Sequence, residues 1–166
     1  GYAAAIRAAQ LGLEPLLIEK ENLGGTCLNW GCIPTKALIA AAEAYENTKE
    51  CSKFGITAEA TFDWSKVVDH AKNTVLKNRK GLEYLFKKNN IRTVQGEAKF
   101  LSGNSVEVDG KIINAENIIL ATGSSVKDLP HIKIDGRQII GSSEALYLDK
   151  LPKSVAILGG GVIGCE

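Results

Sequence analysis

The chain begins with Gly-Tyr-Ala-Ala-Ala-Ile-Arg-Ala-Ala-Gln-Leu-Gly-Leu-Glu-Pro-Leu-Leu-Ile-Glu, residues 1–19, and this stretch decides the predicted fold. Residues 1–11 are rich in alanine, which predicts a helix, and Gly12 stands where a helix ends. A short apolar run typical of a buried strand follows, and it ends in the acidic Glu19. A helix and then a strand that ends in an acid form the second half of a βαβ nucleotide-binding unit.

This unit predicts where a dinucleotide would bind. In such units an acid about 20 residues beyond the glycine turn holds a ribose hydroxyl. Counting back from Glu19 places the turn at or just before Gly1, which we expect to be its last glycine. The alternative is that Glu19 is a surface acid at the end of a strand.

Two cysteines follow, in Gly24-Gly25-Thr26-Cys27-Leu28-Asn29-Trp30-Gly31-Cys32-Ile33-Pro34-Thr35-Lys36. Pro34 suits the first turn of a helix, and the positive end of a helix stabilises a thiolate such as that of Cys32. The spacing leaves three alternatives: a redox pair, a structural disulfide, or half of a zinc site. The zinc site would need a second ligand pair, and Cys51 and Cys165 do not provide one at such a spacing.

Size and charge restrict the class of protein. The 166 residues are enough for one ordinary core and the start of a second domain. The 20 basic and 19 acidic side chains nearly cancel, which argues against binding to nucleic acid or to an anionic membrane surface. No apolar run reaches the ~18–20 residues of a membrane span, and no signal peptide opens the chain. Four sparse cysteines make a reducing cytoplasm the simplest expected location.

Periodicity and turn residues predict the remaining elements. Helices are expected over residues 34–50, from Asp63 to about 88, and over 141–146, with Gly81 as a break in the second of them. The predicted strands are 91–95, 98–101, 105–108 and 111–114, which form an antiparallel meander with a turn at Asp109-Gly110, and the buried strands 117–121 and 154–158.

A second glycine cluster follows the last of these strands. Gly159, Gly161 and Gly164 fit the pattern G-x-G-x-x-G, whose glycines allow a pyrophosphate to approach a helix N-terminus. The chain contains no methionine and its last residues stop as this unit begins, so we expect an internal fragment of a longer protein. The expected division is a first domain over residues 1–152 and the start of a second over 153–166.

Residues 23–36 resemble the redox signature of the FAD-dependent pyridine nucleotide–disulfide oxidoreductases. Residues 33–38 and 152–166 are similar to the members that oxidise protein-bound dihydrolipoamide with NAD⁺, more than to the glutathione or mercuric reductase type. The resemblance covers the whole chain. It implies an α/β fold: a Rossmann-like FAD-binding domain that lacks its first strand, with an inserted meander, and the edge of an NAD-binding domain. It also implies a homodimer that acts on the lipoyl domains of 2-oxo-acid dehydrogenase complexes.

The resemblance implies catalytic roles at matching positions. Cys27 would be the interchange thiol that meets the substrate, and Cys32 would be the charge-transfer thiol that faces the flavin. Lys36, about one helical turn beyond Cys32, would approach flavin N5 and pair with Glu166. Without the motif, Lys36 would be interpreted as a surface side chain. The positions implied to contact FAD are Gly1, Glu19, Gly25, Thr26, Cys32, Lys36, Ala98, Thr122, Gly123 and Ser124, and those implied to contact NAD are Gly159, Gly161 and Gly164.

The sequence departs from the family pattern at several points. Ala98 stands where a glycine is frequent, and Val126 stands where a proline is frequent. The family's catalytic base is a histidine near the C-terminus that is paired with a glutamate, and neither His70 nor His131 has that context. The alternatives are therefore a relative that reduces another disulfide or a metal ion, and a non-catalytic nucleotide-binding module. The fragment alone is expected to be inactive.

Overall fold

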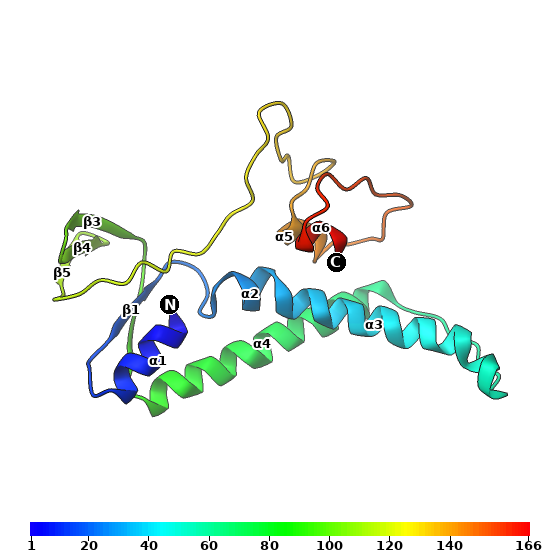
Figure 1. Ribbon diagram of the computed structural model, residues 1–166, viewed down its shortest axis with the longest axis horizontal. Helices are drawn as coiled ribbons and strands as arrows, with labels where there is room; N and C mark the ends of the chain where they lie inside the picture. The colour runs from blue at the N-terminus through cyan, green and yellow to red at the C-terminus, as the bar shows by residue number, and fades with distance from the viewer. The chain divides into compact units, whose positions relative to one another are not determined.

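The structure, a computed structural model, describes all of residues 1–166 as a mixed α/β chain (Figure 1). Contacts divide the chain into two units. The first unit comprises residues 1–26 and 77–124, and the second comprises residues 27–76 and 125–166. The long helix α4 (Trp64–Lys88) contributes residues to both units.

The first unit contains a helix followed by a parallel pair of strands. Helix α1 (Tyr2–Gln10) ends before Gly12, whose φ of +84° is a left-handed conformation that favours glycine. Strand β1 (Leu16–Glu19) pairs in parallel with β2 (Arg92–Gln95). The order of helix and strand confirms the sequence prediction for residues 1–19, although the strand starts three residues later than the predicted Leu13.

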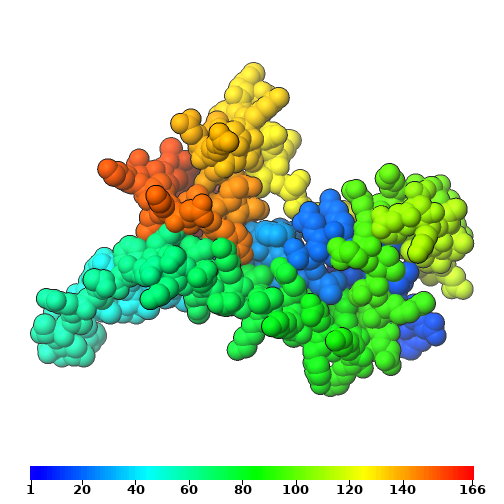
Figure 2. All heavy atoms as spheres, turned by 180° about the vertical axis from the view of Figure 1, so that it is seen from behind, coloured from blue at the N-terminus to red at the C-terminus, as the bar shows by residue number.

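The core of this unit forms between α1 and the second half of α4. Ala5 packs with Leu82, Phe86 and Ile91, each less than 9% exposed. Leu82 and Phe86 lie four residues apart on one face of α4, so a single stripe of the helix is buried. In Figure 2 the atoms of α1, in blue, lie against this green part of α4. The predicted break at Gly81 is wrong: α4 is continuous there, because the burial of Leu82 and Phe86 in the core outweighs the cost of about 1 kcal/mol of a glycine within a helix.

The predicted meander is confirmed for three of its four strands, whereas the predicted strand 91–95 is β2, which pairs in parallel with β1 and is not part of the meander. Strands β3 (Ala98–Ser102), β4 (Ser105–Val108) and β5 (Lys111–Asn114) form an antiparallel sheet in that order. Asp109 and Gly110 both have positive φ, +49° and +77°, which is the backbone of a two-residue hairpin turn. Val106 and Val108 are buried on one face of β4, and the residue between them is less buried. Burial thus alternates along the strand, as in an antiparallel sheet that packs on one face only.

The second unit is built from helices. Helix α2 (Gly25–Trp30) runs into α3 (Cys32–Glu50), and a 3₁₀ turn η1 (Cys51–Phe54) follows. The first half of α4 buries Val68, Ala71 and Val75. Two short helices, α5 (Ser142–Ala145) and α6 (Val162–Cys165), lie in the C-terminal part. The chain has no helix with the length and apolar character that crossing a membrane requires.

Further predictions of secondary structure were wrong. Residues 117–121 and 154–158 form no strand, because a strand needs a partner for its ladder hydrogen bonds and neither apolar run lies along another strand. Helix α3 begins at Cys32 rather than at Pro34. Helix α2 was not predicted, because Gly24 and Gly25 at its start are residues that indicate a turn.

Candidate redox and nucleotide-binding site

The two cysteines of the glycine-rich stretch form a disulfide. Cys27 lies in α2 and Cys32 is the first residue of α3, and their Cα atoms are 4.7 Å apart. The two helices are separated at Gly31, whose φ of −140° and ψ of −116° are not helical. Both cysteines are exposed. A thiolate in solution can therefore reach the disulfide, as thiol–disulfide exchange requires.

The start of α3 is fixed by a hydrogen-bonded turn. The carbonyl oxygen of Gly31 accepts hydrogen bonds from the backbone N–H of Thr35 at 3.1 Å and from its hydroxyl at 2.8 Å. Pro34 is buried directly inside this turn. Cys32 thus lies at the N-terminus of a 19-residue helix, where the helix dipole stabilises negative charge on a thiolate.

Lys36 lies one turn further along α3, and the structure brings it together with Glu166. Its Nζ contacts Oε1 of Glu166 at 2.5 Å. The side chain of Lys36 is 60% exposed and that of Glu166 is 35% exposed, so water remains in contact with the pair. The contact places a carboxylate from the end of α6 beside a cation on the helix that carries Cys32.

Residues far along the chain support the segment between the cysteines. The hydroxyl of Tyr147 donates a hydrogen bond to the carbonyl oxygen of Asn29 at 3.1 Å. Asn29 lies between the two cysteines and is 1% exposed, which makes it the only buried polar residue of the chain. The indole N–H of Trp64 donates to the carbonyl oxygen of Leu148 at 2.7 Å. Sequence reasoning missed these contacts, because no periodicity relates positions so far apart.

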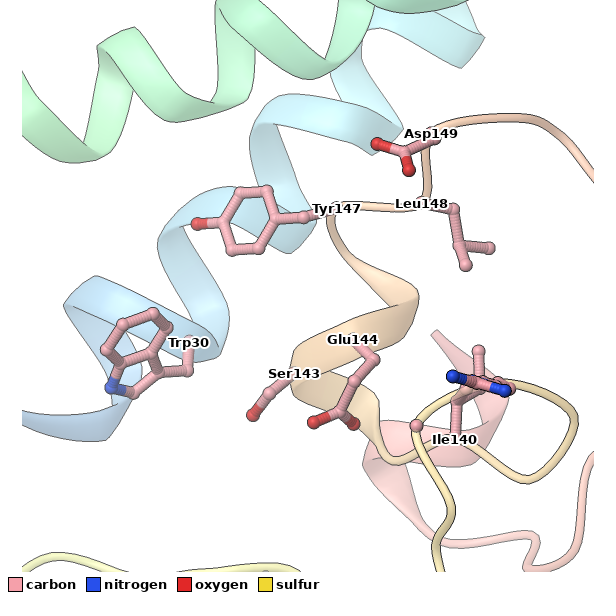
Figure 3. Close-up of a pocket in the computed structure, with 9 residues that line it drawn as sticks. Trp30, Ile140, Ser143, Glu144, Tyr147, Leu148 and Asp149 are labelled. Carbon is pink, nitrogen blue, oxygen red and sulfur yellow. The ribbon is translucent and has the colours of Figure 1, made fainter.

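A pocket of about 420 Å³ lies beside the same residues (Figure 3). Trp30 from α2 and Tyr147 contribute its aromatic side chains, and Ser143 and Glu144 project from α5. The remaining lining residues are Gly136, Arg137, Ile140, Leu148 and Asp149. The charged residues that line it carry both signs.

The predicted ribose-binding acid lies where the sequence placed it, at the carboxyl end of β1. The Oε1 atom of Glu19 accepts a hydrogen bond from the backbone N–H of Glu21 at 2.9 Å. The backbone carbonyl of Glu19 accepts from the N–H of Gly96 at 3.0 Å, which extends the parallel pair beyond β2. One carboxylate oxygen is thereby oriented.

Glycines of the first unit bring two distant segments together. A Cβ atom on Gly123 would lie 3.3 Å from Oγ1 of Thr26, and a Cβ atom on Gly1 would lie 3.6 Å from Cβ of Ala121. Gly25 and Gly123 have positive φ, +73° and +76°. The segment that contains Thr122, Gly123 and Ser124 therefore lies against the start of α2. The predicted contact residue Ala98 lies elsewhere, in β3 opposite Val108.

The second glycine cluster forms a tight turn before α6. Gly159 has a φ of +117°, and a Cβ atom on Gly164 would overlap the carbonyl oxygen of Gly159. Gly161 is the N-cap of α6. The two histidines lie apart from the described contacts: His70 is exposed on α4 and His131 is exposed in a loop.

The residues with shifted pKa values stabilise local turns. The hydroxyl of Ser65, which donates to Asp63 at 2.7 Å, lowers the pKa of that carboxyl, and Asp63 also caps the start of α4. The backbone N–H groups of Arg137, Ile139 and Gln138 lower the pKa of Asp135. A hydrogen bond to Glu46 raises the pKa of Lys49.

The disulfide lies at a helix N-terminus and comes after a nucleotide-binding type of βα unit in the sequence, and these two features indicate the class of protein. The pyridine nucleotide-disulphide oxidoreductase family matches residues 1–166, and the chain belongs to this family. It is a homologue of dihydrolipoyl dehydrogenase: it is 45% identical to that of Chlorobaculum tepidum, 44% to one of Bacillus subtilis and 46% to that of Geobacillus stearothermophilus. Each comparison covers 100% of this chain but 37%, 38% and 36% of those proteins. The chain thus spans little more than a third of these relatives.

A solved structure has the same arrangement. The HOCl-induced flavoprotein disulfide reductase RclA from Escherichia coli matches with a TM-score of 0.81 and 30% sequence identity. The match covers 98% of this chain and 35% of RclA. The Cu(II) complex of RclA gives the same TM-score with 29% identity. The parallel pair and the antiparallel meander of this chain are therefore parts of the flavoprotein disulfide reductase fold.

Proposed function

We propose that the chain provides the redox disulfide and part of the FAD site of an enzyme that oxidises protein-bound dihydrolipoamide with NAD⁺. The observation that carries the proposal is the exposed Cys27–Cys32 disulfide at the N-terminus of α3. A structural bridge needs no thiolate stabilisation at one of its sulfurs, whereas an exchanging disulfide does. The 45% identity to a dihydrolipoyl dehydrogenase supports the choice of substrate.

The residues of the first unit fit the nucleotide part of FAD. The N–H groups of the first turn of α1 have no partners within the helix and suit a pyrophosphate. Glu19 has a carboxylate oxygen for a ribose hydroxyl, and Gly25 and Gly123 leave backbone exposed where Thr26 and the 122–124 segment meet. Thr26 is bonded directly to Cys27, so the cofactor loop leads without interruption into the redox pair. Bound FAD would take two electrons from the thiol pair and deliver them to NAD⁺ as a hydride.

The chain's own residues carry out the exchange with substrate. A dihydrolipoyl thiolate attacks Sγ of Cys27, the Cys27–Cys32 bond breaks, and Cys32 leaves as a thiolate that the N-terminus of α3 stabilises. The second dihydrolipoyl thiolate attacks the lipoyl sulfur of the mixed disulfide and releases Cys27. The lipoyl group is oxidised to its cyclic disulfide, and both enzyme cysteines are reduced by the same two electrons.

Lys36 and Glu166 supply charge next to this pair. We assign to Lys36 the stabilisation of the negative charge that develops on the reduced flavin, with Glu166 holding the ammonium in place. Gly159, Gly161 and Gly164 are assigned to the NAD site. The division into residues 1–152 and 153–166, the homodimer and the lipoyl domains of 2-oxo-acid dehydrogenase complexes as partners belong to the same proposal.

Single cysteine variants of the full-length protein test this proposal. Cys27→Ser and Cys32→Ser should each abolish NAD⁺-dependent oxidation of dihydrolipoamide while FAD remains bound, as seen in the flavin absorbance. The control Cys51→Ser should keep its activity, because Cys51 is a free thiol whose Sγ only contacts backbone carbonyl oxygens. Unchanged turnover in Cys27→Ser would remove the disulfide from the mechanism. Turnover with another disulfide but not with lipoamide would favour a relative of the glutathione reductase type.

A further inference from the structure

We propose that Tyr147 is a positioning residue of the redox disulfide: through the carbonyl oxygen of Asn29 it keeps the two cysteines close together after the disulfide has been reduced. The inference rests on the proposed function, because it concerns the state that forms when Cys27 and Cys32 exchange with a dithiol. All the residues involved lie in the second unit.

The acceptor of this hydrogen bond lies inside the loop that the disulfide closes. Asn29 is the next-to-last residue of α2, and its carbonyl oxygen accepts the hydrogen bond. The hydroxyl of Tyr147 supplies the donor at 3.1 Å from a position 118 residues away. In Figure 3 the hydroxyl of Tyr147 points toward α2 and away from Leu148. The bond thus attaches the middle of the 27–32 segment to another part of the fold.

The donor is itself held in place from several sides. Trp64 on α4 donates its indole N–H to the carbonyl oxygen of Leu148, the residue after Tyr147, at 2.7 Å. Nζ of Lys72, two turns further along α4, lies 6.0 Å from the centroid of the Tyr147 ring. The preceding residue, Leu146, is 8% exposed and anchors the backbone on the other side. The phenol is therefore fixed before the disulfide opens, and it does not depend on the disulfide for its position.

The consequence appears only in the reduced state. In the oxidised state the covalent bond holds Cys27 and Cys32 together across the break at Gly31. In the reduced state α2 can turn about that break, and the Tyr147–Asn29 hydrogen bond opposes the movement. The bond thus raises the effective concentration of one thiol at the other, which favours closure of the disulfide. A pair that closes more readily has a more negative reduction potential.

The variant that isolates this bond is Tyr147→Phe, which keeps the ring and removes only the hydroxyl. The matched control is Tyr84→Phe, because Tyr84 is 64% exposed on α4 and belongs to the other unit. Trp64→Phe is a second variant: it removes the hydrogen bond to the carbonyl oxygen of Leu148, which helps to position Tyr147, and leaves the Tyr147 hydroxyl in place. A purely structural role would lower the stability of both redox states alike and leave the potential unchanged.

The test is a redox titration of the full-length proteins in buffers of reduced and oxidised dithiothreitol. After acid quenching and alkylation, the tryptic peptide 21–36 carries both cysteines of the pair and neither Cys51 nor Cys165, so mass spectrometry counts the thiols of this pair alone. We expect Tyr147→Phe to make the disulfide easier to reduce by about threefold, or ~14 mV at ~30 mV per tenfold change. Trp64→Phe should move the potential the same way by less, and Tyr84→Phe should not move it.

Two outcomes distinguish failure of the inference from failure of the proposed function. If the pair titrates in the parent but Tyr147→Phe and Trp64→Phe both have the parent's potential, or a more negative one, the inference is wrong and the proposed function stands. If the peptide of the parent stays oxidised even in fully reduced dithiothreitol, the disulfide is structural and both are wrong.

Discussion

The ammonium of Lys36 lies 2.5 Å from Oε1 of Glu166, although 130 residues separate the two along the chain. One partner lies in the first turns of α3, after Cys32, and the other is the residue that directly follows α6. An exposed ion pair contributes only about 0–1 kcal/mol to stability. The pair therefore contributes little to stability, and its proposed role beside Cys32 is the part that needs a test.

Replacing Lys36 by Gln should lower lipoamide turnover at least tenfold and leave the urea midpoint of unfolding nearly unchanged. The neutral side chain removes the cation and breaks the ion pair. The matched control is Lys49→Gln, which breaks another exposed pair, with Glu46 at 2.9 Å on the same helix. Equal turnover in the two variants would show that Lys36 is only a surface cation.

Replacing Gly164 by Ala should disrupt the glycine turn before α6. The added Cβ would overlap the carbonyl oxygen of Gly159, and backbone would have to move to accommodate it. We expect a loss of about 1–3 kcal/mol in unfolding free energy, typical of overpacking, together with weaker NAD⁺ binding measured by calorimetry. Gly160→Ala is the control, because nothing lies within 4 Å of its added Cβ. Identical behaviour of the two variants would contradict the turn.

Gly96 should also be intolerant of a side chain. It links β2 to β3 with a φ of +152°, and a Cβ atom there would lie 2.5 Å from Cγ1 of Val108. Gly96→Ala should therefore destabilise the protein by about 1–3 kcal/mol in chemical denaturation. Gly103→Ala, at a site with nothing within 4 Å of the added Cβ, should change the stability by much less. A loss in the control as large as in Gly96→Ala would show that the strand junction is not the cause.

The cap of α4 should make stability depend on pH in the acidic range. Hydrogen bonds from Ser65 and Lys66 lower the pKa of Asp63 in the folded state below its value in the unfolded chain. The stabilisation is therefore complete above the unfolded pKa, about 3.9, and is lost as the pH falls through the lower folded pKa. Urea midpoints of unfolding measured from pH 7 to pH 3 should fall more steeply for the parent than for Asp63→Asn.

A control for this pH dependence is Asp69→Asn, which removes one exposed carboxylate from the same helix and corrects for the change in net charge. Its midpoints should keep the slope of the parent. If the urea midpoints of Asp63→Asn and of the parent fall with the same slope from pH 7 to pH 3, the charged carboxylate of Asp63 does not stabilise the protein by capping α4.

The elements that the sequence predicted well are those with local causes. The apolar stripe of α4 has helical spacing, and Asp109-Gly110 is a hairpin turn in almost any context. The runs 117–121 and 154–158 were predicted as strands from their apolar character alone, and the structure contradicts this. Whether an apolar run is a strand depends on a neighbouring strand, which one sequence does not reveal.

The same distinction holds at the candidate site. The Cys27–Cys32 pair was visible from spacing and from family resemblance, whereas its redox role, like the roles of Lys36 and Glu166, stays a prediction. The contact between Tyr147 and Asn29 could not be predicted, because it joins a residue after a four-residue helix to a backbone carbonyl 118 residues earlier. Side-chain periodicity carries no information about such contacts.

The parallel pairing of β1 with β2 also has a kinetic consequence. The strands join through a loop of about 75 residues, the separation between Gln95 and the Lys20 carbonyl that its side-chain amide contacts at 2.8 Å. Closing such a loop costs more chain entropy than closing the two-residue turn between β4 and β5. The meander should therefore form early during folding and the parallel pair late. Before the pair closes, the edge of β1 is open to pairing with another chain, so refolding at high protein concentration favours aggregation at this strand.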